Sequence, residues 1–162
     1  MSSVAKPVIV VVVCIVTCLW ALPARGEEAA DFSGTWKVNV EKSDFGPMPK
    51  PKSTTMKIEH KEPAIKWFMP LIDQEGNESR TESTAAIDGK EHPFKEGPFT
   101  HTHSFRRISP STIEYVTRSS DGKTIGTGTW TISKDGKVLT QKANTTDMNA
   151  DPLTVTQVFE KQ

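Results

Sequence analysis

Apolar and polar residues alternate along most of the chain after residue 30. In the segment 31–40, Trp36, Val38 and Val40 stand at every second position, with polar residues between them. A period of two is typical of a β-strand with one buried face. Similar segments follow at short intervals, at 54–60, 64–72, 79–87, 92–94, 100–108, 112–119, 123–133, 137–146 and 153–161. No stretch after residue 26 shows a helical period of useful length, so the pattern predicts an all-β protein.

Short turns separate these segments. Three of them contain an Asp-Gly pair, at Asp88-Gly89, Asp121-Gly122 and Asp135-Gly136. Asp-Gly between two alternating segments is the strongest short signal for a β-hairpin. Consecutive hairpins form an antiparallel meander, and for one domain of this size we expect an up-and-down β-barrel of about 8–10 strands, because a closed barrel leaves no exposed edges. A β-sandwich is the alternative.

The segment 46–53 joins the first two predicted strands and contains three prolines at alternate positions, Pro47, Pro49 and Pro51. Proline at this spacing excludes a helix and favours an extended connection. We therefore expect a surface linker, with no helical lid over the barrel.

The first 26 residues have the features of a signal peptide. Lys6 precedes an almost unbroken apolar run at 7–22, and Ala24-Arg25-Gly26 offers small residues for cleavage after Gly26. The run is shorter than the ~20 residues of a comfortable membrane span, although an uncleaved anchor is an alternative. Lipid attachment at Cys18 is a minor one. We expect residues 27–162 to form a single exported domain, secreted or periplasmic, with no membrane span.

The composition narrows the function further. Both cysteines, Cys14 and Cys18, lie in the leader, so the exported domain has no disulfide, thiol nucleophile or thiolate metal site. The 20 Lys and Arg residues balance the 20 Asp and Glu residues, unlike the basic surface of a nucleic-acid-binding protein. The chain lacks the common catalytic and phosphate-binding motifs. We therefore expect neither an enzyme nor a cofactor, and a monomer that binds no nucleic acid.

The segment 100–108 carries the most suggestive side chains. His101, His103 and Phe105 share one face of a strand, which we expect to point inward. Two imidazoles at this spacing can share a metal ion, but a metal site normally needs three or four ligands, so half-exposed histidines are the better interpretation. Arg106 and Arg107 point to opposite faces, so one of them can enter the interior and meet an anion; ordinary surface charge is the alternative.

Several motifs resemble those of known β-barrels. The opening Gly34-Thr35-Trp36-Lys37 is similar to the Gly-x-Trp motif of the calycins, which include lipocalins and fatty-acid-binding proteins, and 154–161 is similar to the last strand of the latter. The whole exported chain resembles a bacterial family of exported lipocalin-like proteins of unassigned function. The motifs shared with that family are Gly34-Thr35-Trp36-Lys37 with Asn39, Lys42-Ser43, Phe45-Gly46-Pro47, Pro51-Lys52-Ser53, Asp88-Gly89-Lys90-Glu91 with Pro93, Lys134-Asp135-Gly136-Lys137 with Leu139-Thr140, and Phe159-Glu160-Lys161-Gln162.

The resemblance implies a ligand-binding interior, with one departure. Fatty-acid-binding proteins carry an Arg-x-Tyr pair in the last strand that grips a carboxylate, whereas this chain has Gln157 and Phe159 there. A neutral amide cannot make the charge-assisted pair that Arg makes with a carboxylate. If the last strand keeps the family's phase, Val155, Gln157 and Phe159 face inward, and we expect Trp36 to be a structural plug of the core.

Two functional hypotheses follow. In the first, the barrel binds a small apolar or weakly polar molecule, hydrophobic or amphipathic. The predicted binding residues are Trp67, His101, His103, Phe105, Tyr115, Trp130, Gln141, Gln157 and Phe159. In the second, the protein is a structural or interaction protein of the cell envelope, with a barrel filled by its own side chains. The volume of the interior cavity discriminates between them.

Overall fold

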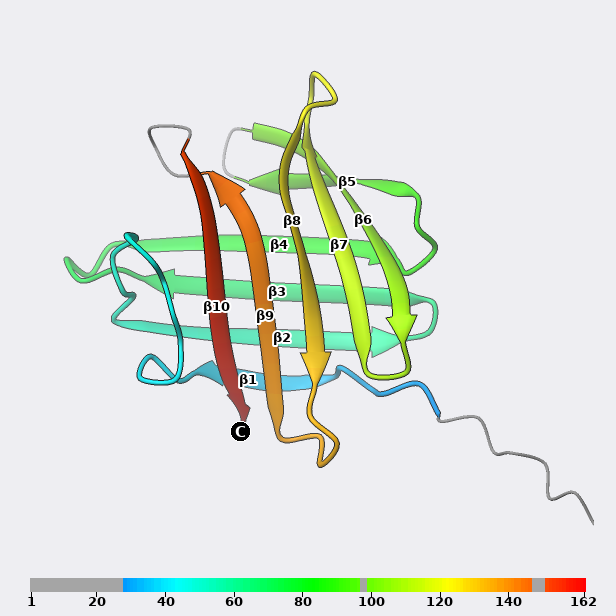
Figure 1. Cartoon of the computed structure of the whole chain (residues 1–162), viewed down its shortest axis with the longest axis horizontal. Coiled ribbons are helices and arrows are strands. Elements are labelled where there is room, and N and C mark those ends of the chain that lie inside the picture. Colours follow the sequence, from blue (N-terminus) through cyan, green and yellow to red (C-terminus); the bar gives the residue numbers. More distant parts are fainter. Residues whose placement is uncertain (1–27, 97–98, 147–150) are drawn as a thin grey trace, which may run out of the picture.

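Ten strands make up the fold, shown in Figure 1. The computed structural model describes residues 28–96, 99–146 and 151–162, so the predicted signal peptide at 1–26 lies outside the described residues. The strands are β1 (Gly34–Val38), β2 (Ser53–Lys61), β3 (Ala64–Ile72), β4 (Glu78–Ala86), β5 (Glu91–Glu96), β6 (Phe99–Ser109), β7 (Thr112–Ser119), β8 (Thr124–Ile132), β9 (Val138–Thr146) and β10 (Pro152–Lys161). Over the same ranges there is no helix, and hence none of a length and apolarity that would span a membrane.

The strands form a closed antiparallel barrel. Each strand pairs with its neighbours in the sequence, and β1 closes the ring by pairing with β10. In Figure 1, β2–β4 cross β8–β10 at a steep angle, so the barrel resembles two sheets folded onto each other. The pairing between β4 and β5 is the least extensive among the described strands, because a single register pair, Glu82 with Lys95, joins them. The prediction of an up-and-down barrel of about 8–10 strands is confirmed.

The Asp-Gly turns form as the sequence predicts. Gly89, Gly122 and Gly136 have φ angles of 74°, 82° and 70°, a left-handed conformation that glycine adopts without steric cost. In each turn the aspartate Oδ1 accepts the backbone N–H of the lysine two positions later. The turn residues thus fix the register of the hairpins β4–β5, β7–β8 and β8–β9.

The proline-containing connection between β1 and β2 is held against the barrel at both of its ends. The backbone groups of Asp44 and Thr156 exchange two hydrogen bonds, of 2.7 and 2.8 Å, and the neighbouring Phe45 is buried. Near β2, Lys52 N–H donates to the carbonyl of Ile72 at 2.9 Å, and the Gln74 amide donates to the carbonyl of Lys50 at 2.8 Å. The segment contains no helix, so the expected absence of a helical lid is confirmed.

The core fills much of the barrel interior. On β2, Thr54, Met56 and Ile58 are buried between more exposed neighbours, as the alternation predicts. Trp36 is completely buried, and its indole N–H donates to the carbonyl of Phe32 at 3.0 Å. The ring is buried and its N–H has a hydrogen-bond partner within the protein, so Trp36 is the structural core residue that the sequence predicts.

Candidate functional site

The interior of the barrel contains a cavity of about 60 Å³. Eight side chains from β2, β3 and β6–β9 line it: Met56, Trp67, Met69, His103, Phe105, Tyr115, Trp130 and Gln141. Met69 and Gln141 are half-buried, whereas the other six are buried. The rigid part of the wall is aromatic, and the two methionines are its adaptable part, because an unbranched thioether chain has several rotamers of similar energy.

Aromatic rings pack closely around His103. Its imidazole stacks on Phe94, with 4.0 Å between ring centroids and 29° between planes. Trp67 lies almost parallel to the imidazole at 6.1 Å, and Tyr115 lies at 6.3 Å. Trp130 meets Trp67 edge-on, with centroids 5.9 Å apart. These contacts fix the rings as a preorganised apolar wall.

Several buried polar atoms in this wall lack a hydrogen-bond partner among the described residues. They are the indole nitrogens of Trp67 and Trp130, Nδ1 of His103 and Oε1 of Gln141. The amide nitrogen of Gln141 does have a partner, because it donates to the Tyr115 hydroxyl at 3.2 Å. A buried polar group without a partner typically costs about 1–3 kcal/mol, so the cavity favours an occupant that offers both acceptors and donors.

The cavity carries no fixed charge near neutral pH. Burial lowers the pKa of His103 from 6.5 to about 4, with a smaller contribution from the neighbouring His101. Burial raises the pKa of Tyr115, partly offset by its hydrogen bond with Gln141. Neither Lys nor Arg is among the lining residues. An anion would therefore lose its hydration in this site without gaining a cationic partner.

The structure brings six of the nine predicted binding residues to the cavity wall. Three lie elsewhere: His101 is half-buried beside Phe94, Gln157 is half-buried opposite Gln141, and Phe159 is fully buried in the core. Sequence reasoning missed Met56 and Met69 as lining residues. Met69 follows Trp67 by two positions and Met56 precedes Ile58 by two, so the alternation already placed both on inward faces.

Over the part of the chain that the structure describes, no three His, Cys, Asp or Glu side chains gather closely enough to hold a metal ion. His101 and His103 therefore form no metal centre with a third described residue of these types. His103 instead stacks within the aromatic wall.

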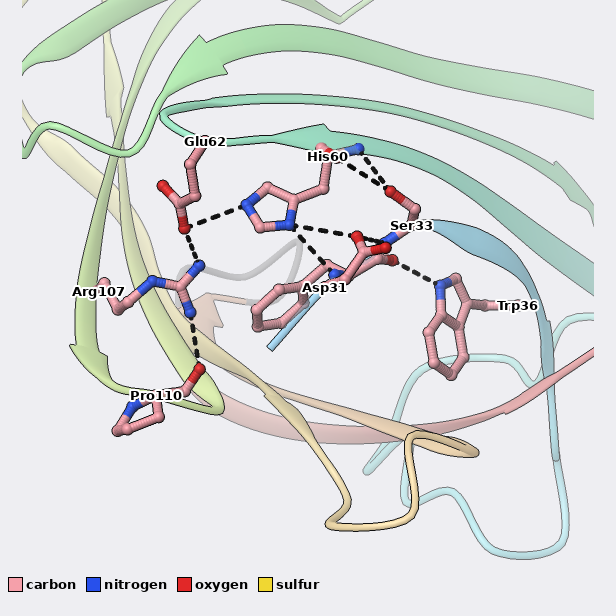
Figure 2. Close-up of polar contacts among 8 residues, drawn as sticks. Asp31, Ser33, Trp36, His60, Glu62, Arg107 and Pro110 are labelled. Atoms are coloured by element: carbon pink, nitrogen blue, oxygen red, sulfur yellow. Dashed lines mark hydrogen bonds and ion pairs between the residues drawn. The ribbon is translucent and has the colours of Figure 1, made fainter. Parts of the chain in front are cut away.

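A second polar cluster lies where residues 31–33 pack against the end of the β2–β3 hairpin, and Figure 2 shows it. The His60 side chain is only 4% exposed, and its Nδ1 accepts the Phe32 N–H at 3.2 Å. Asp31 Oδ1 lies 3.4 Å from the same nitrogen, and Glu62 Oε1 lies 3.3 Å from Nε2. Sequence reasoning missed this cluster, because its members are about 30 residues apart and share no motif.

The presence of Ser33, His60 and Asp31 in one cluster resembles a catalytic triad only in composition. Ser33 Oγ donates to the backbone carbonyl of His60 at 3.1 Å and accepts its backbone N–H at 2.9 Å. The hydroxyl is therefore engaged by the main chain, whereas a triad requires the imidazole to take the hydroxyl proton. The hydrogen bonds of Ser33 join the segment before β1 to the end of β2.

Arg107 belongs to this cluster and does not line the cavity. Its guanidinium pairs with Glu62 and donates to the carbonyl of Pro110 at 2.8 Å (Figure 2). The same group lies 5.7 Å from the centroid of the Phe32 ring. Arg106, on the opposite face, is exposed and pairs with Glu114. Neither arginine supplies a cationic anchor at the cavity.

Comparison with known proteins identifies the fold. No protein-family model and no curated protein matches the sequence, whereas 46 solved chains match the structure. The zebrafish ileal bile acid-binding protein, solved with cholic acid, superposes with a TM-score of 0.57 at 11% identity, over 81% of this chain and 98% of that one. The extracellular fatty acid-binding protein As-p18 gives a TM-score of 0.50 at 12% identity, over 81% and 96%. The chain thus has the ten-stranded barrel fold of these two binding proteins.

Proposed function

We propose that this protein is a ligand-binding barrel that holds a small, uncharged, apolar or weakly polar molecule among Trp67, His103, Tyr115, Trp130 and Gln141. One observation carries the proposal: the cavity combines an aromatic wall with several buried polar atoms that have no partner among the described residues. Ligand sites are mostly apolar with a few convergent polar groups. The fold shared with a bile acid-binding and a fatty acid-binding protein supports this use of the interior.

The cavity's size limits the ligand. Sites for drug-sized ligands typically enclose about 300–1,000 Å³, and a cavity of about 60 Å³ is well below that range. A long fatty acid or a steroid does not fit the interior as it stands. A ligand of modest size requires a side chain of the wall to move, and Met69, half-buried and unbranched, is the lining side chain best suited to do so.

A barrel filled by its own side chains, serving as a structural or interaction protein of the cell envelope, is the second candidate. The small cavity volume favours it. The two candidates differ in whether the partnerless polar atoms receive a ligand group or only water.

Calorimetric titration with 1-hexanol and hexanoate at pH 7 tests the proposal. We expect the alcohol to bind at least tenfold more tightly, since the cavity lining contains no Lys or Arg and the pKa of His103 is about 4. Binding of neither compound would favour the filled barrel. Tighter binding of hexanoate would require a cationic anchor and contradict the neutral site.

We also propose that the protein is exported as a monomer to the cell exterior or the periplasm. The apolar leader ending at Gly26 and the motifs resembling exported bacterial lipocalin-like proteins support this proposal. N-terminal sequencing of the protein isolated from its source should begin at or near Glu27. A polypeptide that begins at Met1 and remains in the membrane fraction would contradict cleavage.

A further inference from the structure

We propose that the ligand of this barrel is a small, flat, uncharged ring compound that carries both a carbonyl-type oxygen and an N–H or O–H group. This inference rests on the proposed function of the cavity as a binding site. It goes further because it assigns the shape and the hydrogen-bonding pattern of the ligand.

The walls indicate a flat ligand. Trp67, His103 and Tyr115 present nearly parallel rings, with interplanar angles of 18° and 27° to the imidazole. Trp130 and Phe105 close the site at steeper angles, 77° to Trp67 and 71° to His103. Faces and edges of aromatic rings together accommodate a planar guest better than a branched or coiled one.

The volume limits the ligand to one ring at most, and only if a side chain of the wall moves. A dry cavity of about 150 Å³ admits benzene, and the present cavity is less than half that size. Met69 is the lining side chain that can move most readily to enlarge the space, because it is half-buried and unbranched, whereas Met56 is only 1% exposed. Two fused rings would require the rings themselves to move.

The polar atoms indicate the functional groups. The indole N–H groups of Trp67 and Trp130 can only donate, so they call for an acceptor such as a carbonyl oxygen. The Oε1 atom of Gln141 is a carbonyl oxygen and can only accept, so a ligand donor would satisfy it. The Gln141 amide nitrogen donates to Tyr115, which fixes the orientation of the amide group. Trp67 and Trp130 are only 6% and 3% exposed, so bulk water cannot readily accept hydrogen bonds from their indole N–H groups. A molecule with one acceptor and one donor satisfies both needs.

The test compares two probes with the same number of non-hydrogen atoms, 2-pyridone and toluene. 2-Pyridone carries the carbonyl and the N–H on a planar ring, and toluene carries neither. A site built to hydrogen-bond its ligand rejects the analogue that lacks the polar groups. We therefore expect calorimetry to show that 2-pyridone binds more tightly than toluene to the protein isolated from its source.

The indole N–H signals in a ¹⁵N NMR spectrum provide the second measurement. We expect 2-pyridone to shift the signals of Trp67 and Trp130. Trp36 is a built-in control, because its N–H already donates to the Phe32 carbonyl and does not face the cavity. A shift confined to Trp36, or no shift at all under saturating 2-pyridone, would overturn the inference.

Replacing Gln141 tests the donor requirement. In Gln141→Leu we expect the preference for 2-pyridone over toluene to fall at least tenfold, since a ligand N–H would be left without an acceptor. Gln157→Leu is the matched control, because Gln157 pairs directly with Gln141 in the neighbouring strand but does not line the cavity. An unchanged preference in Gln141→Leu would contradict the assigned pattern.

The outcomes separate this inference from the proposed function. Toluene binding as tightly as 2-pyridone, with 1-hexanol still bound, would overturn the ligand class and leave the binding function standing. If 1-hexanol, toluene and 2-pyridone all fail to bind or to move the Trp67 and Trp130 signals, the proposed function and this inference both fall.

Discussion

The imidazole of His103 lies face to face with the ring of Phe94, with 4.0 Å between their centroids, inside the barrel. His103 is only 6% exposed, and no described residue offers a hydrogen bond to its Nδ1. The folded protein therefore holds this histidine in its neutral form, at a pH where a histidine in the unfolded chain takes up a proton.

This environment predicts a loss of stability in mild acid. The pKa of His103 is about 4 in the folded protein, whereas an unperturbed histidine of the unfolded chain has a pKa of 6.5. As the pH falls, the unfolded chain is therefore protonated at His103 before the folded protein is. The contribution of His103 to the free energy of unfolding is complete above pH 6.5. It decreases by roughly 3 kcal/mol as the pH falls from 6.5 to about 4, and it does not change further at lower pH.

Urea unfolding at several pH values between 7 and 4 measures this effect. The variant His103→Phe keeps an aromatic ring against Phe94, and its stability should fall much less between pH 7 and pH 4 than that of the wild type. His92→Gln is the control, because His92 pairs with His103 across β5 and β6 but is partly exposed. A His103→Phe protein with the pH dependence of the wild type would show that another group is responsible.

A glycine next to Tyr115 predicts a second measurable effect. Gly128 lies opposite Tyr115 in the register of β7 and β8, and a Cβ there would stand 2.6 Å from the Tyr115 ring and collide with the Lys142 carbonyl. Gly128→Ala should therefore destabilise the fold by roughly 3 kcal/mol, the upper end for overpacking. It should also displace the Tyr115 hydroxyl from Gln141.

Gly126→Ala is the matched control on the same strand. A Cβ at Gly126 meets its nearest atoms at 3.8 Å, an ordinary contact, so its stability should change by less than about 1 kcal/mol. Thermal unfolding of both variants checks the comparison. Equal stabilities would mean that Tyr115 does not lie against β8 as described.

The two neighbouring arginines predict opposite outcomes. Arg107→Met should cost about 1 kcal/mol and speed hydrogen exchange at the Phe32 amide, because Arg107 holds Glu62 beside His60 and covers Phe32. Arg106→Met removes an exposed pair with Glu114 and should cost only a few tenths of a kcal/mol. Unfolding midpoints and amide exchange distinguish them, and a larger effect from Arg106 would contradict the assignment.

The fold was predictable from the sequence because its signals are local. The alternation of apolar and polar residues around Trp36 predicts a strand with one buried face, and an Asp-Gly pair predicts a turn. Both predictions depend only on neighbouring residues in the sequence. Pairing consecutive strands then required no long-range choice, apart from the closure of β1 on β10.

The site was predictable only in part, because alternation gives the face of a residue but not its depth along the barrel. Gln157 and Phe159 were expected in the site with Gln141, yet only Gln141 borders the cavity. The contact between Phe32 and His60 joins residues 28 positions apart and could not be inferred from spacing. The volume left between the side chains depends on how all of them pack together.

Native mass spectrometry of the protein isolated from its source tests the central claim most directly. We predict that the wild-type protein carries a small neutral molecule, and that Met69→Trp, which fills the cavity, loses it. Phe68→Trp, a similar change at a half-buried neighbour that does not line the cavity, should retain it. A wild-type protein with no bound molecule, or a bound molecule that Met69→Trp retains in full, would contradict a ligand site inside the barrel.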